Sequence, residues 1–501
     1  MTAASSERAP LYGNWIKPRS AGIGPLGLAS TIGVFIGLIV VLVVSLLAGA
    51  GPAVVLAVVL LVPLLLASVP VGGRPLGVML TIRAGWLWRW MRRGHQYRTG
   101  ALTNLPISAG RPLPGVLART KILSVVDGYD NEVGVIYRPG KNLYTVVLRC
   151  TADGAGLVER EVVDNWVAGY GGFLATLGAE QGLRGATVVV DTAPDTGTRL
   201  RGEYERTLSP EAPAVAQAVM SEVVERYPAA SSDNAVYVAL TYAGRELVRN
   251  GRDTDAVLTE IARQVPGLAA TLIDAGGGDV EPVSAAELPA IARVAYDPAT
   301  HAHFSAATAA GDPIELDWSE AGPVAAEEAW GSYRHDSGTS MTWEMTRAPA
   351  GTVYSHVLAP LLAPHPAFVR KRVALIYRPH NPGEATRVTE RASNTASFTA
   401  KGGKGRVSAS AERVVMAAEQ AEREVAAGAG VTRFALMVTV TVGDETTLEE
   451  AAAAVNRLGQ RSQLTLRRCY GHQAAAFATT LPVGFLPWEH AVLPTSVRDL
   501  L

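Results

Sequence analysis

Cysteine is almost absent from this chain of 501 residues, which contains only Cys150 and Cys469. Two cysteines exclude a disulfide framework or a zinc cluster built within one chain, and such low usage fits a reducing compartment. The sequence also has no Gly-x-x-x-x-Gly-Lys-Ser/Thr motif; the nearest stretch, Lys401 to Arg406, has the wrong spacing. Nucleotide hydrolysis through a P-loop is therefore excluded.

Charged residues are missing from residues 26–69. Two apolar runs, Leu26 to Ala48 and Ala53 to Val69, are joined there by four Gly, Ala and Pro residues. At about 1.5 Å rise per residue the first run can cross a hydrocarbon core of about 30 Å. The second run is near the lower length limit and contains Pro63. The pattern favours a two-helix transmembrane hairpin over two core helices of a soluble protein.

Acidic residues are also missing around these runs, because the first acid after Glu7 is Asp127. Basic residues flank the runs on both sides, three before them and six arginines from Arg74 to Arg98. By the positive-inside rule, both ends of a hairpin then lie in the cytoplasm. A cleaved signal peptide fits less well, since a second apolar run follows at once. We therefore expect a multi-pass protein of the inner (cytoplasmic) membrane with both termini cytoplasmic.

Small residues recur four apart in the first apolar run, at Ala29, Gly33 and Gly37. Such a ridge lets another helix approach closely. We predict that these three residues form a helix-packing surface. The approaching helix is either a partner subunit or the second apolar run of the same chain, and the sequence leaves both open.

Tryptophan and arginine alternate soon after the second run. On a helix this mixture would hold indole rings at the level of lipid headgroups and guanidinium groups near phosphates, with anionic lipids as partners. Nucleic acid is the alternative ligand. The chain after residue 126 is net acidic, so no direct sequence-specific nucleic-acid binding is expected. The predicted membrane-interface residues are Trp86, Trp88, Trp90, Arg89, Arg92 and Arg93.

The rest of the chain alternates strand and helix patterns, which predicts an α+β fold. Residues 120–126, 132–138 and 143–150 predict a three-stranded meander, and residues 156–177 an amphipathic helix. Ser284 and Glu287 form a capping box at the start of another helix. Residues 297–337 and 393–406 lack a sustained period and are expected to be irregular.

A short internal match divides the body. VGVIYRP at residues 133–139 resembles VALIYRP at residues 373–379, and both halves contain strands and helices in similar order. We therefore expect two related α+β modules behind the membrane segment. The expected organisation is a cytoplasmic N-terminal tail (1–23), a transmembrane hairpin (24–72), a basic juxtamembrane segment and linker (73–115), a first α+β module (116–330) and a second α+β module (331–501).

Residues with catalytic side chains do not form a recognisable motif. Asp191 and Asp195 follow a buried strand pattern, where a turn or cap role is favoured over a metal site. His335-Asp336-Ser337 contains the residue types of a catalytic triad, but neighbours in sequence do not form one. We expect no catalytic residues, no cofactor and no bound metal, and hence a protein that is not an enzyme.

One family resemblance connects these features. GHQAAAFATTLPVG (residues 471–484) resembles the end of the N-terminal, non-ATPase domain of conjugative type IV secretion ATPases. RVALIYRP, followed by PGEATR, resembles the same domain, and the predicted hairpin resembles the small inner-membrane subunit that is fused to this ATPase in some systems. The chain is identified as a member of the actinobacterial conjugation-associated integral membrane proteins. Because the motor domain is missing, ATP hydrolysis cannot be carried over.

The resemblance implies a non-enzymatic inner-membrane scaffold of a conjugative, type IV-like secretion complex. Its cytoplasmic body would dock a separate motor ATPase, and other inner-membrane secretion subunits or a second copy of the chain would complete the assembly. The predicted docking residues are Phe485 and Trp488, together with the Ala/Glu-rich helix near residues 410–427. The alternative function is a structural membrane subunit of a type VII secretion machine. A membrane-tethered enzyme is a third class, disfavoured by the missing catalytic cluster.

Overall fold

The fold was analysed in a computed structural model, which describes residues 28–71, 74–100, 103, 110–152, 154, 156, 158–209, 211–226, 232–349, 351–401 and 409–490. The mixed α+β class predicted from the sequence is confirmed. The chain divides into two compact units, which we describe separately. The small unit contains the described residues 28–95 together with the short segment after Leu486, and the large unit contains Gln96–Leu486.

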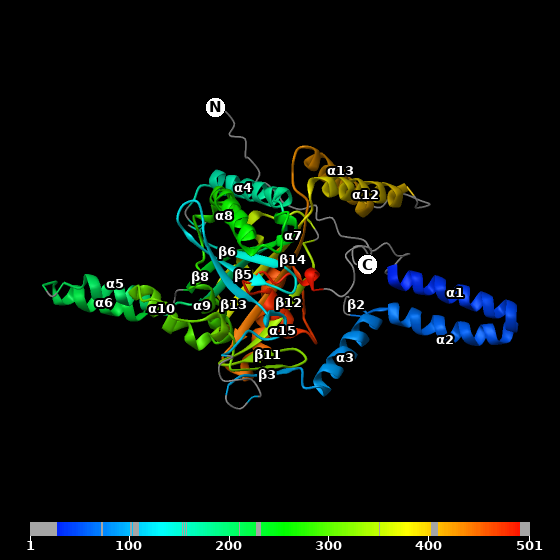
Figure 1. Cartoon of the computed structure of the whole chain (residues 1–501), viewed down its shortest axis with the longest axis horizontal. Coiled ribbons are helices and arrows are strands. Elements are labelled where there is room, and N and C mark those ends of the chain that lie inside the picture. The colour runs from blue at the N-terminus through cyan, green and yellow to red at the C-terminus, as the bar shows by residue number, and fades with distance from the viewer. Residues whose placement is uncertain are drawn as a thin grey trace. The chain divides into compact units, whose positions relative to one another are not determined.

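Helices dominate the described part of the small unit. Its elements are α1 (Leu28–Ala48), α2 (Ala50–Ser68), β1 (Pro70–Val71), β2 (Arg74–Pro75) and α3 (Leu76–Met91). Gly49 separates α1 from α2 with a φ of 86°, a conformation that glycine adopts without steric cost. This reversal lets α1 and α2 pack against each other along their lengths (Figure 1).

One antiparallel sheet runs through the whole large unit. Its strands lie in the order β3-β10-β11-β12-β14-β13-β7-β8-β6-β5-β4, with β15 added to β12 and β9 added to β6. The strands are β3 (Gln96–Arg98), β4 (Lys121–Val126), β5 (Glu132–Arg138), β6 (Leu143–Thr151), β7 (Leu183–Pro194), β8 (Ser232–Ala243), β9 (Asp279–Pro282), β10 (Ala325–Glu328), β11 (Tyr333–His335), β12 (Gly338–Arg347), β13 (Arg370–Pro379), β14 (Thr432–Val442) and β15 (Thr465–Arg468).

Helices cover this sheet or connect its strands. Figure 1 shows α4 and α8 side by side over one part of the sheet, and the pairs α5–α6 and α12–α13 extending from it. The helices of the large unit are α4 (Arg160–Ala179), α5 (Thr198–Thr207), α6 (Ala214–Arg226), α7 (Gly244–Leu247), α8 (Thr254–Leu272), α9 (Leu288–Tyr296), α10 (His301–Ala310), α11 (Ala359–Leu362), α12 (Pro382–Lys401), α13 (Ala409–Ala426), α14 (Leu448–Arg461) and α15 (Gln473–Thr479).

The apolar core lies on one face of the sheet and has two parts. In the first, Leu148 and Leu240 from the strands pack with Phe173 of α4 and Ile261 of α8. The second part brings strand residues such as Trp343 and Val438 together with residues of α14. Burying a large apolar side chain stabilises the fold by about 1.5–3 kcal/mol, so these two clusters hold the helices on the sheet.

The opposite face of the same strands is polar although it is buried. Hydroxyl groups pair across neighbouring strands, with oxygen–oxygen distances of 3.0 Å for Thr145–Thr241 and 2.8 Å for Ser340–Thr441. Residues at the C-terminal end of the body cover this face. Gly484 is among them, and a Cβ atom at Gly484 would lie only 2.3 Å from Thr145 Oγ1. Its φ of 66° also favours glycine, so the close contact requires this residue.

The strand order has the same plan from either end of the sheet. The meander β4-β5-β6 at one end corresponds to β10-β11-β12 at the other, and the pairs α5–α6 and α12–α13 connect corresponding central strands. The matched segments VGVIYRP and VALIYRP lie in β5 and β13. These two strands occupy different places in the order, so the seven-residue match does not relate corresponding strands.

Two segments that were expected to be irregular are partly ordered. Residues 297–337 contain α10, β10 and β11, and α12 continues through residues 393–401. The Ser/Thr-rich part of α12 has few helix-favouring residues, but α12 packs along α13, and such packing overrides weak propensity. The hydrogen bonds of the predicted capping box form, because Ser284 N and Oγ donate to Glu287 Oε2 and Glu287 N donates back to Ser284 Oγ. They lie in the turn before α9, which begins at Leu288 and not at the capping box.

Candidate functional site

Apolar side chains cover the outside of α1. Leu46 and Leu47 are 78% and 83% exposed, and Phe35 and Ile39 are also exposed. A continuous apolar surface of this kind marks a site for lipid or another protein. The stretch Thr31–Ala48 has the length and the mean hydropathy, 2.9, of a membrane span.

The prediction of a multi-pass protein is wrong. Within the described residues, α1 contains the one helical stretch that is long and apolar enough to cross a membrane, and the apolar stretch found in α2 is the shorter Ala50–Leu60. The assignment of both termini to the cytoplasm depended on two spans, and it fails with the second span.

The predicted small-residue ridge lies on α1. Gly37 is buried and Gly33 is half-buried, while the side chain of Ala29 lies outside the described part of the chain. Ala53 of α2 is also buried, and α1 and α2 pack together. The burial of Gly37 is therefore consistent with packing against the chain's own second helix, one of the two alternatives left open by the sequence.

The six predicted interface residues lie on α3 and in the turn that follows it. No residue of α3 is buried. Trp86 and Trp90, four residues apart, stack with ring centroids 6.5 Å apart. Trp88 lies two residues from each and therefore on the opposite side of the helix, where the Arg92 guanidinium carbon is 4.3 Å from its ring centroid. The indole rings thus occupy two sides of α3.

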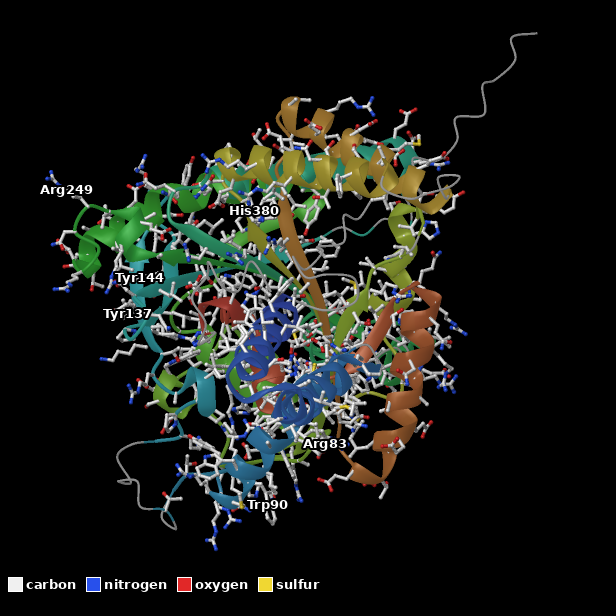
Figure 2. All side chains as sticks on the ribbon, turned by 90° about the vertical axis from the view of Figure 1, so that its right-hand side faces the viewer. Arg83, Trp90, Tyr137, Tyr144, Arg249 and His380 are labelled. Carbon is white, nitrogen blue, oxygen red and sulfur yellow. The ribbon has the colours of Figure 1, made fainter. Side chains whose placement is uncertain are left out.

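Arginine side chains extend the same surface. Arg89 is half-buried on α3, and Arg93 follows the helix with a φ of 56° in the turn. Figure 2 shows Arg83 and Trp90 as side chains of α3. The described residues of α3 include no acid, so its surface combines exposed indoles with positive charge. This composition is typical of a helix that lies at a lipid headgroup layer.

The acid considered as a metal ligand, Asp191, has an arginine partner. Arg370 donates to it from Nε and Nη2, with distances of 2.9–3.1 Å. Burial alone lowers the pKa of the Arg370 guanidinium, but the attraction and hydrogen bonds of Asp191 raise it above its ordinary value. Asp195 accepts a hydrogen bond from Gly197 N and so stabilises a turn. In the described part of the chain, no group of three His, Cys, Asp or Glu residues could hold a metal ion.

The residues of the His335-Asp336-Ser337 sequence have separate partners. His335 is fully buried between Tyr296 O, at 2.6 Å, and Ser340 Oγ, at 2.7 Å. Burial lowers the pKa of His335 to about 4. Asp336 instead lies 2.8 Å from Arg293, which also binds Asp297 at 2.6 Å. The three residues therefore do not form a triad.

Three consecutive basic residues in β13 are buried, a feature that the sequence interpretation missed. Arg370, Lys371 and Arg372 have exposed fractions of 9%, 2% and 1%. Lys371 Nζ donates to Ala363 O, and burial lowers its pKa to about 8. Among the described residues, none of the three guanidinium nitrogens of Arg372 has a hydrogen-bond partner, and its guanidinium carbon lies 4.6 Å from the Phe477 ring centroid. The sequence did contain a signal for this buried basic cluster, because three consecutive charged residues lie next to an apolar strand pattern.

The predicted docking residues differ in exposure. Phe485 is only 4% exposed, and the Arg138 guanidinium carbon lies 5.5 Å from its ring centroid. Its ring is therefore part of the body's interior in this structure and offers no surface to a partner. Trp488 is half-buried. On α13, by contrast, Val414 and Met416 are exposed, Met416 by 65%.

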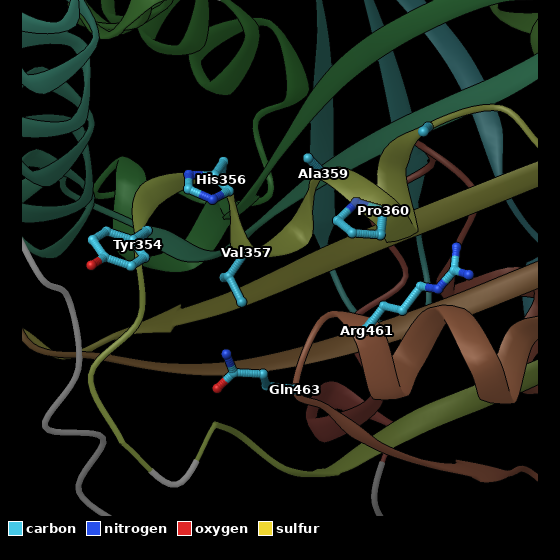
Figure 3. A pocket seen from close by; sticks show the side chains of 8 residues that line it. Tyr354, His356, Val357, Ala359, Pro360, Arg461 and Gln463 are labelled. Atoms are coloured by element: carbon cyan, nitrogen blue, oxygen red, sulfur yellow. The ribbon is translucent and has the colours of Figure 1, made fainter. Parts of the chain in front are cut away.

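A shallow depression of about 440 Å³ lies beside α11 and α14 (Figure 3). Tyr354 and His356 stack on one side of it, with ring centroids 5.7 Å apart and an interplanar angle of 6°. Arg461 and Gln463 line it from the end of α14. Among the described residues, its lining contains no carboxylate or cysteine.

Comparison with known proteins adds one finding. Residues 19–77 match the model of a family described as a domain of unknown function (DUF8461). The matched residues contain all of α1 and α2 and the first residues of α3. No curated protein matches the chain.

Proposed function

We propose that this protein is a membrane-anchored, non-enzymatic scaffold of a conjugative, type IV-like secretion complex. In this proposal α1 is the anchor, and the large unit docks a separate motor ATPase through α13. The observation that carries the proposal is the exposed apolar surface of α1, which an aqueous environment would not stabilise. The resemblance of residues 471–484 to the non-ATPase domain of transfer ATPases supplies the class of complex.

The role of the charged residues supports a scaffold. Asp191 binds Arg370, Asp336 binds Arg293, and His335 is held between two oxygen atoms inside the body. Each of these groups has a structural partner that keeps it away from solvent. The sheet uses its polar side chains to hold one conformation, as expected for a rigid platform.

The docking surface is placed on α13 because of its exposed side chains. Met416 and Val414 are apolar and exposed there, and Phe398 of the adjacent helix α12 is 80% exposed. Exposed glutamates, among them Glu419 and Glu422, lie on the same helix. The partner should combine an apolar pocket with a basic rim. The pocket would cover the exposed apolar side chains, and the basic rim would complement the glutamates around them.

The body consists, in this proposal, of two related α+β modules with the predicted bounds 116–330 and 331–501, except that β10 (Ala325–Glu328) belongs to the meander of the second module. The support is the strand order. In the sheet, each meander lies next to two central strands, β8 and β7 or β14 and β13, and its last strand also pairs with one short strand, β9 or β15. A motor that is itself built from repeated subunits would meet similar surfaces on both modules. The pairs α5–α6 and α12–α13 are the corresponding surfaces.

Membrane extraction of the full chain tests the anchor. We expect the chain to stay in the pellet after alkaline carbonate treatment of membranes. Replacing Ile39 and Leu42 of α1 by lysine should move it to the supernatant, because a charge at the centre of a span costs about 2.5–3.5 kcal/mol. Ile39→Leu with Leu42→Ile is the matched control and should stay in the pellet. Release of the unaltered chain by carbonate would contradict the anchor.

Co-purification of the motor tests the docking surface. Met416→Asp should reduce recovery of the transfer ATPase with the full chain at least tenfold, since a carboxylate would enter an apolar contact. Ile273→Asp is the control, because Ile273 is 50% exposed and lies after α8, outside both helix pairs. Equal recovery of the ATPase with Met416→Asp would overturn docking through α13. Recovery of a type VII secretion ATPase in its place would overturn the type IV assignment.

A further inference from the structure

The two ends of the large sheet are finished differently. At one end β10 is covered by β3, with Ala325 paired to Arg98 and Glu327 to Gln96. At the other end, β4 is the corresponding outer strand, and among the described residues it pairs with β5 alone. An open outer strand presents unpaired N–H and C=O groups and is a template for another strand.

The unpaired groups of β4 belong to alternate residues. Asp127 N donates to Asn131 O at 3.0 Å in the turn that joins β4 to β5. Hydrogen-bonded and non-hydrogen-bonded pairs alternate along an antiparallel ladder, so Val125, Leu123 and Lys121 direct their backbone groups toward β5. Ile122, Ser124 and Val126 then direct theirs outward.

The side chains of β4 lack the devices that usually block an open edge. The strand has the sequence KILSVV, with no proline, and its register with β5 runs without a bulge from Lys121 to Val126. Its one charge lies at its first residue. Val126 is 55% exposed, and Leu123 and Val125 are only partly covered by the core of the same chain.

We propose that β4 pairs with β4 of a second copy of this chain, in an antiparallel register centred on Ser124. This register uses the outward backbone groups, because Ser124 then faces Ser124 of the partner subunit and Ile122 faces Val126 of the partner subunit. About six backbone hydrogen bonds form across such a ladder. The two sheets become one continuous sheet.

Charge and apolar side chains favour this register over its neighbours. At each end of the ladder, Lys121 of one subunit faces Asp127 of the partner subunit. Each end therefore carries one pair of opposite charges. Leu123 faces Val125 of the partner subunit in a non-hydrogen-bonded pair, where side chains approach most closely. A shift by one residue would turn these apolar side chains to the other face.

Cysteine cross-linking of the full chain in detergent tests the register. Ser124→Cys should form a disulfide-linked dimer under mild oxidation, because facing residues of a hydrogen-bonded pair have Cα atoms about 5.5 Å apart, within disulfide range. Val126→Cys alone should not, but a mixture of Ile122→Cys and Val126→Cys chains should cross-link to each other. Tyr129→Cys, in the exposed turn after β4, measures chance collisions. Both native cysteines are buried, which keeps the background low.

Molar mass provides a second measurement that does not depend on cysteine. By sedimentation in detergent the unaltered chain should form a concentration-dependent dimer. Ser124→Pro should be monomeric but folded, because proline removes an outward N–H that β5 does not use, and Ser124→Ala should remain dimeric. A dimeric Ser124→Pro, or Ser124→Cys cross-linking no better than Tyr129→Cys, would overturn the proposal. So would cross-linking of Ser124→Cys to a different protein. Failure would leave docking through α13 untouched, since α13 is tested by other residues.

Discussion

Arg372 lies directly opposite Asp191 in the register of β13 and β7, yet Asp191 binds Arg370 instead. Arg370 reaches Asp191 diagonally with two of its nitrogens, while Arg372 stacks on Phe477. Both guanidinium groups are buried, but within the described part of the chain Arg370 forms an ion pair with a carboxylate and Arg372 does not. The two arginines should therefore contribute to stability with opposite sign.

Replacing each arginine by methionine separates the two roles. Arg370→Met should destabilise the fold by about 3–5 kcal/mol, because it leaves the carboxylate of Asp191 buried without a partner. Arg372→Met should be neutral or stabilising, because it removes a buried charge and keeps an unbranched chain against the Phe477 ring. Urea unfolding of the full chain in detergent, followed by tryptophan fluorescence, measures both. A loss of stability in Arg372→Met as large as in Arg370→Met would contradict this account.

The stability of the body should fall in acid because of His335. Its folded pKa is lowered to about 4, below the ordinary value of 6.5, so the unfolded chain binds more protons between these values. Stability should be unaffected by this residue above pH 6.5 and should decrease as the pH falls from 6.5 to 4. His335→Gln should lose about 1–2 kcal/mol at neutral pH through its altered hydrogen bonds.

The pH profile distinguishes this effect from a general acid effect. Thermal unfolding of the unaltered chain and of His335→Gln, measured at pH 7.5, 6 and 5, should converge as the pH falls. His303→Gln is the matched control, since His303 lies on α10, is not buried, and should follow the unaltered profile. Parallel curves for the unaltered chain and His335→Gln would show that His335 does not titrate in this range.

Gly484 should not tolerate a side chain. A Cβ atom there would lie 2.3 Å from Thr145 Oγ1 and 2.4 Å from Thr241 Oγ1, and φ is 66°. We expect Gly484→Ala to destabilise the body by about 1–3 kcal/mol through overpacking and strain. Gly202→Ala is the control: Gly202 is inside α5 with open space around it, so alanine should add about 0.5–1 kcal/mol. Chemical unfolding midpoints measure the difference.

Both cysteines should resist thiol reagents in the native chain. Cys150 and Cys469 are buried, and burial raises the pKa of the Cys150 thiol to about 11. The reactive thiolate is therefore scarce and inaccessible at pH 8. Labelling with an aromatic disulfide reagent should detect no rapidly reacting thiol before unfolding and two thiols per chain after it. A fast-reacting thiol in the native chain would contradict the burial.

The local elements of the fold were predictable from sequence, but their assembly was not. The strand predicted at residues 132–138 is β5 with the same limits, because β-branched and aromatic residues bounded by turn residues specify a strand locally. The pairing of β7 with β13 joins residues far apart in the chain, and no local pattern encodes it. This pairing makes one sheet of the two halves.

The candidate site was predicted in part. Trp86, Trp88 and Trp90 were found from their composition, but their division between two sides of α3 follows from the helix itself. Phe485 was predicted to dock a partner and is buried, because aromatic residues serve as core residues as readily as contact residues. Two spans were predicted from apolar composition, but within the described residues only α1 contains a stretch long and apolar enough to cross a membrane.

The pairing of β7 with β13 has a consequence for how the protein folds. Val189 pairs with Ala374, so the central ladder forms only after a very long loop has closed, whereas the outer meanders β4-β5-β6 and β10-β11-β12 involve neighbouring segments. Contacts between distant residues slow folding, and they expose unpaired strands until they form. During synthesis the strands of the first half would pair with one another first. The edge of β7 would then stay unpaired until β13 has left the ribosome. The edge of β7 is therefore the place at which chaperone binding or misassembly would begin.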